Sequence, residues 1–531
     1  MALFFSFLIA MLVTMALIPP LMRVARRWQF VDIPNERKVH LHAIPRVGGV
    51  AMVAGAVLPL ILWLWPSPQV IALLAGIGVI VVFGVWDDRA DLDYRLKFAG
   101  QCVAAIIVWW AGVRVGYLPW VGELTPPLSL GLTVLGLLTI TNAVNLADGL
   151  DGLAGGSTLL SLTAIAVLGY MSGQMAVVLI ALAVMGSILG FLRFNTHPAR
   201  VFMGDGGSQF LGFTTGVLAI FLTQGINSPY SLSLPALLLG LPILDTAVVM
   251  ARRLRQGRSP FSADKNHIHH RLLNLGLDHY HAVFIIYVVQ ALLIIAAYYM
   301  RNASDALILL FYGLCCAAVV AMLSLAPRRF TSKEVVAPDT TLAVTMIPSG
   351  EQVTYWGVTA VAYSMPLYLG TGAWFSAMPS ADILWLVMIL MAILILFWHR
   401  RGQSIGWMER GGVYLAGALS LYLAQRSSLG GLWTMFSNGY FALLAVLVVV
   451  AFRCSPDHRF VATPLDFLVV FLAVVFPQVP GLDVGYAQDL TRLVVLFYAI
   501  ELVLSRLQGR NDWVRAASCG LLCVPLLRYV V

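Results

Sequence analysis

The chain has 531 residues, of which 60% are hydrophobic and only 11% are charged, and its mean hydropathy is +0.87. Soluble domains carry about 25% charged residues, so this composition excludes a soluble globular protein and indicates an integral membrane protein. The formal net charge of +8 is assigned to membrane topology and contact with anionic lipid, and not to nucleic-acid binding.

Apolar stretches close to the 17–25 residues or so that cross a bilayer recur along the whole chain. The first predicted spans are 2–22, 47–65, 69–86, 98–113, 128–145, 157–171, 175–194, 206–224, 232–250, 282–300 and 304–326. Seven weaker spans follow, at 354–375, 382–398, 411–425, 432–452, 463–480, 490–506 and 513–530. We therefore expect an all-α polytopic membrane protein.

Residues 327–353 form the only long stretch that is neither apolar nor rich in motifs. This stretch predicts a cytoplasmic linker between a membrane core, residues 1–326, and a further membrane bundle, residues 354–531. The bundle's loops hold few ionisable residues apart from arginines, which leaves its role open between stability, lipid access, homodimer contact and binding of a glycan-assembly protein.

The positive charges predict the orientation of the chain. The first of them, Arg23, follows the first apolar run, which argues against a cleaved signal peptide and places the N-terminus outside. If the spans alternate, the Lys and Arg residues that fall on the outer side are Arg114, Arg301, Arg426, Arg492 and Arg528. All the others fall inside, as the positive-inside rule predicts for loops on the cytoplasmic side.

Carboxylates of the first part gather at the inside ends of the spans. Asp87 and Asp88 end an apolar run, and Asp91 and Lys97 follow in the loop. Ionised carboxylates beside hydrocarbon need compensating charge, so the pair predicts a metal or general-base site, with Lys97 as a phosphate partner. The alternative is a solvated loop with internal ion pairs.

Two further loops combine glycines with oxygen ligands. One follows the span at 128–145 and contains Asn145, Asp148, Gly149 and Asp151, and the other presents Asp205 at a Gly-rich helix start. Carboxylate and amide oxygens suit Mg²⁺, and glycines allow a ligand to approach the backbone closely. The alternative for the first loop is a Gly-rich turn that only caps short helices.

The loop 252–271 is rich in cations and histidines, including Arg253, His267, His269 and His270. Arginine clusters bind phosphate, and the histidines fit hydrogen bonding to a diphosphate better than a transition-metal site. The alternative is a set of topology-determining arginines with incidental histidines.

Together these loops resemble the polyprenyl-phosphate N-acetylhexosamine-1-phosphate transferase family over residues 1–326. The segments that carry the resemblance are Asp32-Ile33-Pro34-Asn35-Glu36-Arg37-Lys38-Val39-His40, Pro45-Arg46-Val47-Gly48-Gly49, Asp87-Asp88, Asn142-Ala143-Val144-Asn145, Met203-Gly204-Asp205 and His267-Ile268-His269-His270. The loop from Arg253 to His267 most resembles the branch that uses UDP-N-acetylglucosamine to start O-antigen or common-antigen synthesis. Ile268 interrupts the three consecutive histidines typical of the phospho-MurNAc-pentapeptide branch, which remains the alternative within the family.

The resemblance implies transfer of a sugar-1-phosphate from a UDP-sugar to undecaprenyl phosphate, with release of UMP on the cytoplasmic side. It implies Asn145 and Asp205 as ligands of Mg²⁺, with Mn²⁺ as the alternative metal. It implies Asp87 as the base that activates the lipid phosphate and Lys97 as a phosphate contact, and it places Phe202, Gly149 and Asp151 on the uridine side. The other positions that it marks as important for activity are Asp32, Asp88, Asp91, Asp148, Arg253 and His267.

A transporter is the rival class, because intramembrane acids often mark ion pathways. It predicts ionisable groups near span midpoints, whereas the acids of the first part cluster at span ends. Asp245 is the exception, since it lies deep in an apolar run, and we expect it to be paired or to reach the water of the site.

Overall fold

The computed structural model describes residues 2–32, 43–90, 92–225, 228–259, 267–325, 350–399, 407–453, 467–468, 471, 484–506 and 511–530. Nine helices in these ranges are long and apolar enough to cross a membrane. Apart from two short hairpins, the regular structure of the described ranges is helical. The chain is thus an all-α polytopic membrane protein, as the sequence predicted.

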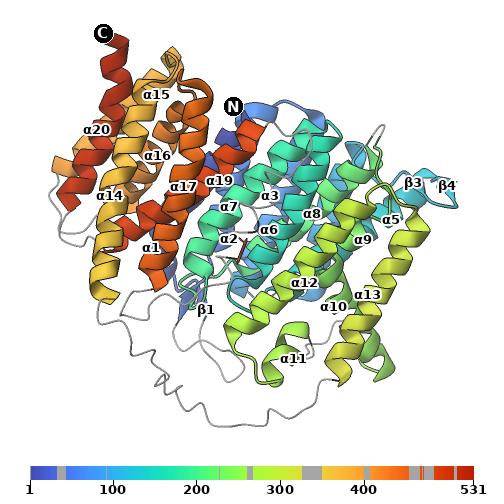
Figure 1. Ribbon diagram of the computed structural model, residues 1–531. Helices are drawn as coiled ribbons and strands as arrows, with labels where there is room; N and C mark the ends of the chain where they lie inside the picture. Colours follow the sequence, from blue (N-terminus) through green and yellow to red (C-terminus); the bar gives the residue numbers. More distant parts are fainter. Residues whose placement is uncertain are drawn as a thin grey trace. The chain divides into compact units, whose positions relative to one another are not determined.

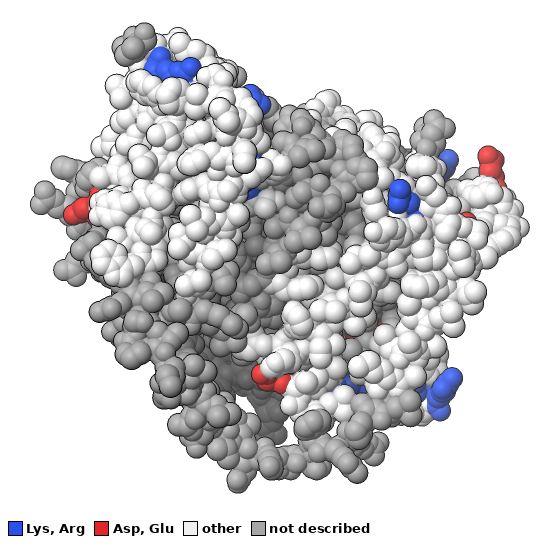
Figure 2. All heavy atoms as spheres, viewed as in Figure 1, with Lys and Arg blue, Asp and Glu red and all other residues white. Residues whose placement is uncertain are grey.

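The described residues fall into two compact units, one within Met1–Val336 and Thr463–Val470 and the other within Ala337–Ala462 and Phe471–Val531. Most of the expected linker, residues 327–353, lies outside the described residues, and residues 350–353 already belong to a helix. Figure 2 shows that Lys, Arg, Asp and Glu are sparse among the described atoms of the face it presents, as expected where protein meets lipid.

The first unit is built from helices around a buried centre. In chain order they are α1 (Ala2–Arg27), α2 (Gly48–Leu64), α3 (Pro68–Ala90), α4 (Tyr94–Trp110), α5 (Pro126–Ala147), α6 (Leu153–Met171), α7 (Met175–Asn195), α8 (Gly204–Gln224), α9 (Pro235–Leu238), α10 (Gly240–Arg255), α11 (Ile268–Asn274), α12 (His279–Met300) and α13 (Asp305–Leu325). The hairpins pair β1 (Val31–Asp32) with β2 (Ile44–Pro45), and β3 (Tyr117–Leu118) with β4 (Gly122–Glu123).

Helices α6, α7 and α8 form the centre of this unit and are buried along most of their length. They run side by side in Figure 1, with α12 along α6. Helices α1 and α2 pack against α7, while α3 and α5 pack against α8. This packing brings the C-terminal ends of α3 and α5 to the N-terminal end of α8, which come from three separate parts of the chain.

The single span expected at 232–250 is wrong, because the structure divides it into α9 and α10. Leu239, at the junction, has φ −116° and ψ 19°, outside the helical region. The amide of Gln290 on α12 repairs the break: its Nε2 donates to the carbonyl of Leu238 (2.8 Å) and its Oε1 accepts from the N–H of Leu241 (3.3 Å). A broken helix is tolerated at membrane depth where such a partner satisfies the freed backbone groups.

A glycine contact sets the spacing of α3 and α8. A Cβ placed at Gly84 would overlap the Cα and N of Gly206. Small residues at a helix crossing let the two backbones approach closely, and this approach brings Asp87 and Asp88, one turn beyond Gly84, to the start of α8.

The second unit contains α14 (Gly350–Trp374), α15 (Ala381–His399), α16 (Trp407–Ala424), α17 (Gly430–Arg453), α19 (Val484–Arg506) and α20 (Asn511–Val530). The expected span 463–480 lies outside the described residues except at 467, 468 and 471. Buried charges tie the helices together: Arg515 on α20 forms a two-pronged ion pair with Glu409 on α16, one prong being Nη2 to Oε2 at 3.2 Å.

Replacing Glu409 with Gln is expected to destabilise the second unit by about 3–5 kcal/mol, because it neutralises the buried acid that pairs with the guanidinium of Arg515. Asp512→Asn is the matched control. Asp512 also pairs with Arg515 (3.2 Å), but its side chain is 82% exposed, so its loss costs about 1 kcal/mol or less. Denaturant unfolding in detergent checks the difference, and equal costs for the two variants would contradict it.

Candidate functional site

The ends of α3, α4 and α8 meet at Lys97. Its ammonium pairs with Asp87 at the end of α3 and lies 3.4 Å from Oδ2 of Asp205 in the first turn of α8. Asp87 also accepts the N–H of Leu92 (2.8 Å). Asp87 is 3% exposed, whereas Asp205 and Lys97 are 32% and 27% exposed. A ligand therefore meets Asp205 and Lys97 first, with Asp87 behind the lysine.

Asp88 holds the N-terminus of α8. Its Oδ1 accepts the N–H of Asp205 (3.0 Å) and its Oδ2 that of Gly206 (3.3 Å), so it serves as an N-cap supplied from another helix. Gly204 has φ +68°, and a Cβ there would overlap the Asp88 carboxylate, so both the backbone conformation and the contact require glycine. Arg46 lies 3.6 Å from Asp88 and pairs with Asp32, which joins the β1–β2 hairpin to the site.

Amide side chains line the neighbouring end of α5. Ser208, on α8, donates to Oδ1 of Asn145 (3.1 Å), which places this amide beside the first turn of α8. One turn earlier, Asn142 donates to Gln101 on α4 (2.7 Å), and Gln101 donates to Gln209 on α8 (3.0 Å). This chain of hydrogen bonds fixes α4, α5 and α8 against one another next to the carboxylates.

Asp148 caps the C-terminal end of α5. Burial, together with the nearby carboxylates of Asp88 and Asp151, raises its pKa to about 7. Its charge therefore opposes folding once the pH exceeds the ordinary carboxyl range.

Asp148→Asn is expected to raise the unfolding midpoint of the metal-free protein at pH 7 or above. Below about pH 4 both states hold the proton and the residue has no effect. Between about pH 4 and 7 only the unfolded state releases it, so wild-type stability falls by up to about 1.4 kcal/mol per pH unit relative to the variant, then levels off. Thermal unfolding from pH 4 to 8 checks this, and an advantage of the variant that does not change with pH would contradict it.

Asp151, in the turn between α5 and α6, is held by the segment that precedes α8. Its Oδ2 contacts Nδ1 of His197 (2.7 Å) and accepts the N–H of Ala199 (3.0 Å), and its carbonyl oxygen lies 3.2 Å from Nε2 of His279. Asp151, His197 and His279 have potential metal-ligand atoms that all lie within 4.8 Å of one another. Within the described part of the chain, they are the one group of at least three acidic, His or Cys side chains that does so.

The two imidazoles of that group do not favour a shared metal. The His197 and His279 rings are stacked, with centroids 4.1 Å apart and planes 17° apart. Since the lone pair of an imidazole nitrogen lies in the plane of its ring, two stacked rings present parallel rather than convergent lone pairs. The arrangement instead matches a carboxylate whose orientation is fixed by a histidine and a backbone N–H.

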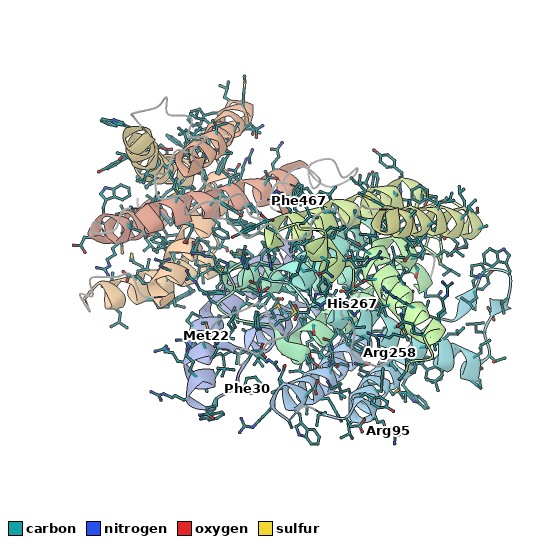
Figure 3. All side chains as sticks on the ribbon, turned by 90° about the horizontal axis from the view of Figure 1, so that it is seen from below. Met22, Phe30, Arg95, Arg258, His267 and Phe467 are labelled. Carbon is teal, nitrogen blue, oxygen red and sulfur yellow. The ribbon has the colours of Figure 1, made fainter. Side chains whose placement is uncertain are left out.

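The histidine segment approaches the same turn from α11. His267 is paired with Asp245 of α10 (2.9 Å), and a Cβ at Gly149 would overlap the ring of His269. Burial, together with His270, lowers the pKa of His269 to about 3, so His269 meets a ligand as a neutral ring. Figure 3 labels His267, immediately before α11, and Arg258, three residues beyond α10.

The chemistry of the residues around Lys97 fits a divalent cation. Lys97 contacts both Asp87 and Asp205, and Arg46 contacts both Asp32 and Asp88, so each of these cations is shared by two acids. Asp205 and Asn145 supply the hard oxygen atoms that Mg²⁺ prefers, on facing helix ends.

Most of the residues singled out from the sequence thus come together in two adjoining groups. The first contains Asp32, Asp87, Asp88, Lys97, Asn145 and Asp205, and the second contains Asp148, Gly149, Asp151, His267, His269 and His270. Phe202 lies just before α8, and its carbonyl accepts the N–H of Gly48 (2.9 Å). Arg253 is buried on α10. Asp91 lies outside the described residues.

The structure adds residues that the sequence did not mark as functional. Arg46 contacts Asp32 and Asp88, and His197 and His279 both contact Asp151. Arg46 stood within a quoted motif, so its signal was present but unused. His197 precedes α8 and His279 begins α12, and only the packing of α12 beside the turn after α5 brings His279 to Asp151.

Comparison with known proteins decides the family. The family model described as "Glycosyl transferase family 4" matches residues 70–223. A probable undecaprenyl-phosphate N-acetylglucosaminyl 1-phosphate transferase of Bacillus subtilis is 38% identical over 291 residues, which cover 54% of this chain and 81% of the relative. The chain belongs to the polyprenyl-phosphate N-acetylhexosamine-1-phosphate transferase family.

Two further relatives of this transferase agree. The undecaprenyl-phosphate alpha-N-acetylglucosaminyl 1-phosphate transferase of Escherichia coli K12 is 33% identical over 279 residues, covering 51% of this chain and 76% of the relative. The decaprenyl-phosphate N-acetylglucosaminephosphotransferase of Mycolicibacterium smegmatis is 37% identical over 302 residues, covering 50% and 74%. The family match at 70–223 takes in the site from Asp87 to Asp205.

Proposed function

We propose that the transferase moves N-acetylglucosamine-1-phosphate from UDP-N-acetylglucosamine to undecaprenyl phosphate, releases UMP and so initiates a cell-surface polysaccharide such as O-antigen. The meeting of Asp87, Lys97 and Asp205 at the ends of three helices carries this proposal. It combines a phosphate-binding cation with carboxylates suited to a divalent metal, at the depth where a lipid phosphate and a soluble nucleotide can both arrive.

We place the site on the cytoplasmic face of a bacterial inner membrane, with the N-terminus outside. The distribution of Lys and Arg along the sequence supports this orientation. Cytoplasmic UDP-sugar can then reach Asp205 and the histidine segment from water, while the polyprenyl chain stays in the bilayer.

Asp205 and Asn145 would hold the metal, Mg²⁺ or alternatively Mn²⁺. When bound, the ion neutralises the diphosphate and the charge that develops on the departing UMP. Because Asp88 accepts the first N–H groups of α8, it fixes Asp205 without itself facing the ligand. Asp88 thus positions the metal ligand.

Lys97 binds and orients the acceptor phosphate, and Asp87, paired with Lys97, accepts any proton that the phosphate carries. An oxygen of the lipid phosphate attacks the β-phosphorus of the donor, the bond from that phosphorus to the bridging oxygen breaks, and UMP leaves with the electron pair. We favour this direct attack over the alternative, a covalent enzyme intermediate through a carboxylate.

The second group would bind the donor. Asp148, Gly149 and Asp151 lie in the turn after α5, and His269, which neighbours His267 and His270, packs directly against Gly149. We assign the uridine to the side of Gly149, Asp151 and Phe202, and the diphosphate to Arg253 and the histidines.

Purified transferase, undecaprenyl phosphate and Mg²⁺, assayed for UMP with a panel of UDP-sugars, tests the proposal. UDP-N-acetylglucosamine is expected to give UMP at the highest rate. If only UDP-MurNAc-pentapeptide gives UMP, the protein has the activity of the phospho-MurNAc-pentapeptide branch instead. If no donor gives UMP, the proposed reaction type is wrong.

A further inference from the structure

Asp245 is a buried acid that the reaction described above does not use. It lies on α10, 7% exposed, and the sequence marked it as the one acid of the first part deep in an apolar run. An ionised carboxylate in such a place needs partners that keep it charged.

Its partners are both at the start of the histidine segment. Oδ2 contacts Nδ1 of His267 (2.9 Å), and Oδ1 accepts the N–H of Ile268 (2.8 Å). The carboxylate therefore fixes the imidazole ring and the backbone of the same turn at once. With 6% of the His267 side chain and 11% of the Asp245 side chain exposed, water competes little for these bonds.

This contact selects one nitrogen of His267 for a ligand. A carboxylate only accepts, so Nδ1 carries the proton that it donates to Asp245, and Nε2 is the nitrogen left for another partner. Among the described residues, the hydrogen bonding of the His267 ring consists of the Asp245 contact alone. A ring that also carries a proton on Nε2 can donate a charge-assisted hydrogen bond from that nitrogen to a phosphate oxygen.

The His267 ring lies beside the other histidines of its segment, and these in turn lie against the turn that follows α5. His267 stacks in parallel with His269 (centroids 5.8 Å apart, planes 7° apart), and His269 lies directly over Gly149. A cavity next to these rings is lined in part by Ala147, Leu153, Asp245 and His269. The orientation of His267 is thus set relative to the turn that follows α5.

We propose that Asp245 is a positioning residue that holds His267 with Nε2 directed to the diphosphate of the nucleotide-sugar donor. This proposal rests on the proposed function. Asp245 acts through His267 and does not itself touch the substrate.

Asp245→Asn tests it. The amide keeps the size and can still accept from Ile268, but its NH₂ donates to Nδ1 instead of accepting from it, so the contact that fixes Nδ1 as the donor and leaves Nε2 for the ligand is lost. The Michaelis constant for the UDP-sugar is expected to rise about tenfold or more, with that for undecaprenyl phosphate unchanged. Asp278→Asn is the matched control: Asp278 also pairs with a histidine, His281 (2.6 Å), but this pair is exposed and is expected to leave both constants unchanged.

A double-mutant cycle separates positioning from a structural role. In the His267→Gln background, Asp245→Asn is expected to add little to the Michaelis constant for the UDP-sugar, because the residue through which it acts is gone. Wild-type constants in Asp245→Asn, equal losses for both substrates, or full additivity with His267→Gln would each overturn the proposal. If Asp245→Asn does not fold, Asp245→Glu serves in its place. It keeps the charge but displaces the carboxylate, and it is expected to raise the Michaelis constant for the UDP-sugar and leave that for undecaprenyl phosphate unchanged.

The proposed function can fail separately. If wild-type protein releases no UMP, the reaction is wrong, and UDP binding measured by calorimetry then tests Asp245 without turnover. Weaker UDP binding by Asp245→Asn, with Asp278→Asn at the wild-type value, would support the positioning role, and equal binding by all three proteins would reject it.

Discussion

Asp205→Asn is expected to lower the rate of UMP release by about 10²–10³-fold and to raise the Mg²⁺ concentration needed for half-maximal activity. Asp205 is the most exposed of the carboxylates around Lys97, and it stands where α8 meets the ends of α3 and α5. The amide keeps the shape of the side chain and removes the charge that would hold the cation. Initial rates over a Mg²⁺ titration measure both effects.

Glu123→Gln is the matched control for this substitution. Glu123 is an exposed acid on the β3–β4 hairpin, away from the ends of α3 and α8 that form the site. It is expected to leave the rate and the Mg²⁺ dependence unchanged. An Asp205→Asn enzyme with wild-type rate and wild-type Mg²⁺ dependence would remove Asp205 from the metal site.

Gly84→Ala is expected to lower activity by about 10²-fold, although residue 84 touches no substrate. The added methyl group would overlap the backbone of Gly206, so α3 and α8 must separate, and a displacement of about 1 Å between catalytic groups costs on this order. Overpacking of this kind should also cost about 1–3 kcal/mol of stability.

Gly78→Ala is its control on the same helix. A Cβ at Gly78 meets nothing within 4 Å, so this change should preserve activity and slightly favour the helix. Turnover and thermal unfolding of the two variants measure the contrast. Equal activity of both would show that the close crossing of α3 and α8 does not position Asp87 and Asp88.

The sequence was sufficient to locate the acids of the site. Asp87, Asn145 and Asp205 lie where apolar runs end, and in a helical membrane protein alternate span ends meet on one face. Their assignment to one site therefore followed from hydropathy and charge alone. The family resemblance then suggested how these residues divide into metal, acceptor and donor residues, and their individual roles stay predictions.

What each acid contacts could not be predicted in the same way. That Asp88 caps α8 depends on the close crossing at Gly84, and that Lys97 covers Asp87 depends on the turn between α3 and α4. The division of the span at Leu239 likewise depends on Gln290, some 50 residues later in the chain, whose amide satisfies the broken backbone. Such contacts are set by tertiary packing, which local patterns of hydropathy do not encode.

The contacts of Asp245 remove the main observation in favour of the rival transporter interpretation. An acid deep in an apolar run is the feature that interpretation requires. In the structure this acid is held by His267 and the backbone of Ile268 at the start of the histidine segment, so its presence is accounted for by the site itself.

The position of a labelled phosphate tests the central claim most directly. UDP-N-acetylglucosamine carrying ³²P in its β-phosphate is incubated with the protein, Mg²⁺ and undecaprenyl phosphate, and the lipid and water phases are separated. Transfer of a sugar-1-phosphate predicts that the label enters the lipid phase while unlabelled UMP accumulates in water. Label that remains in water as UDP, with sugar alone on the lipid, would contradict the account.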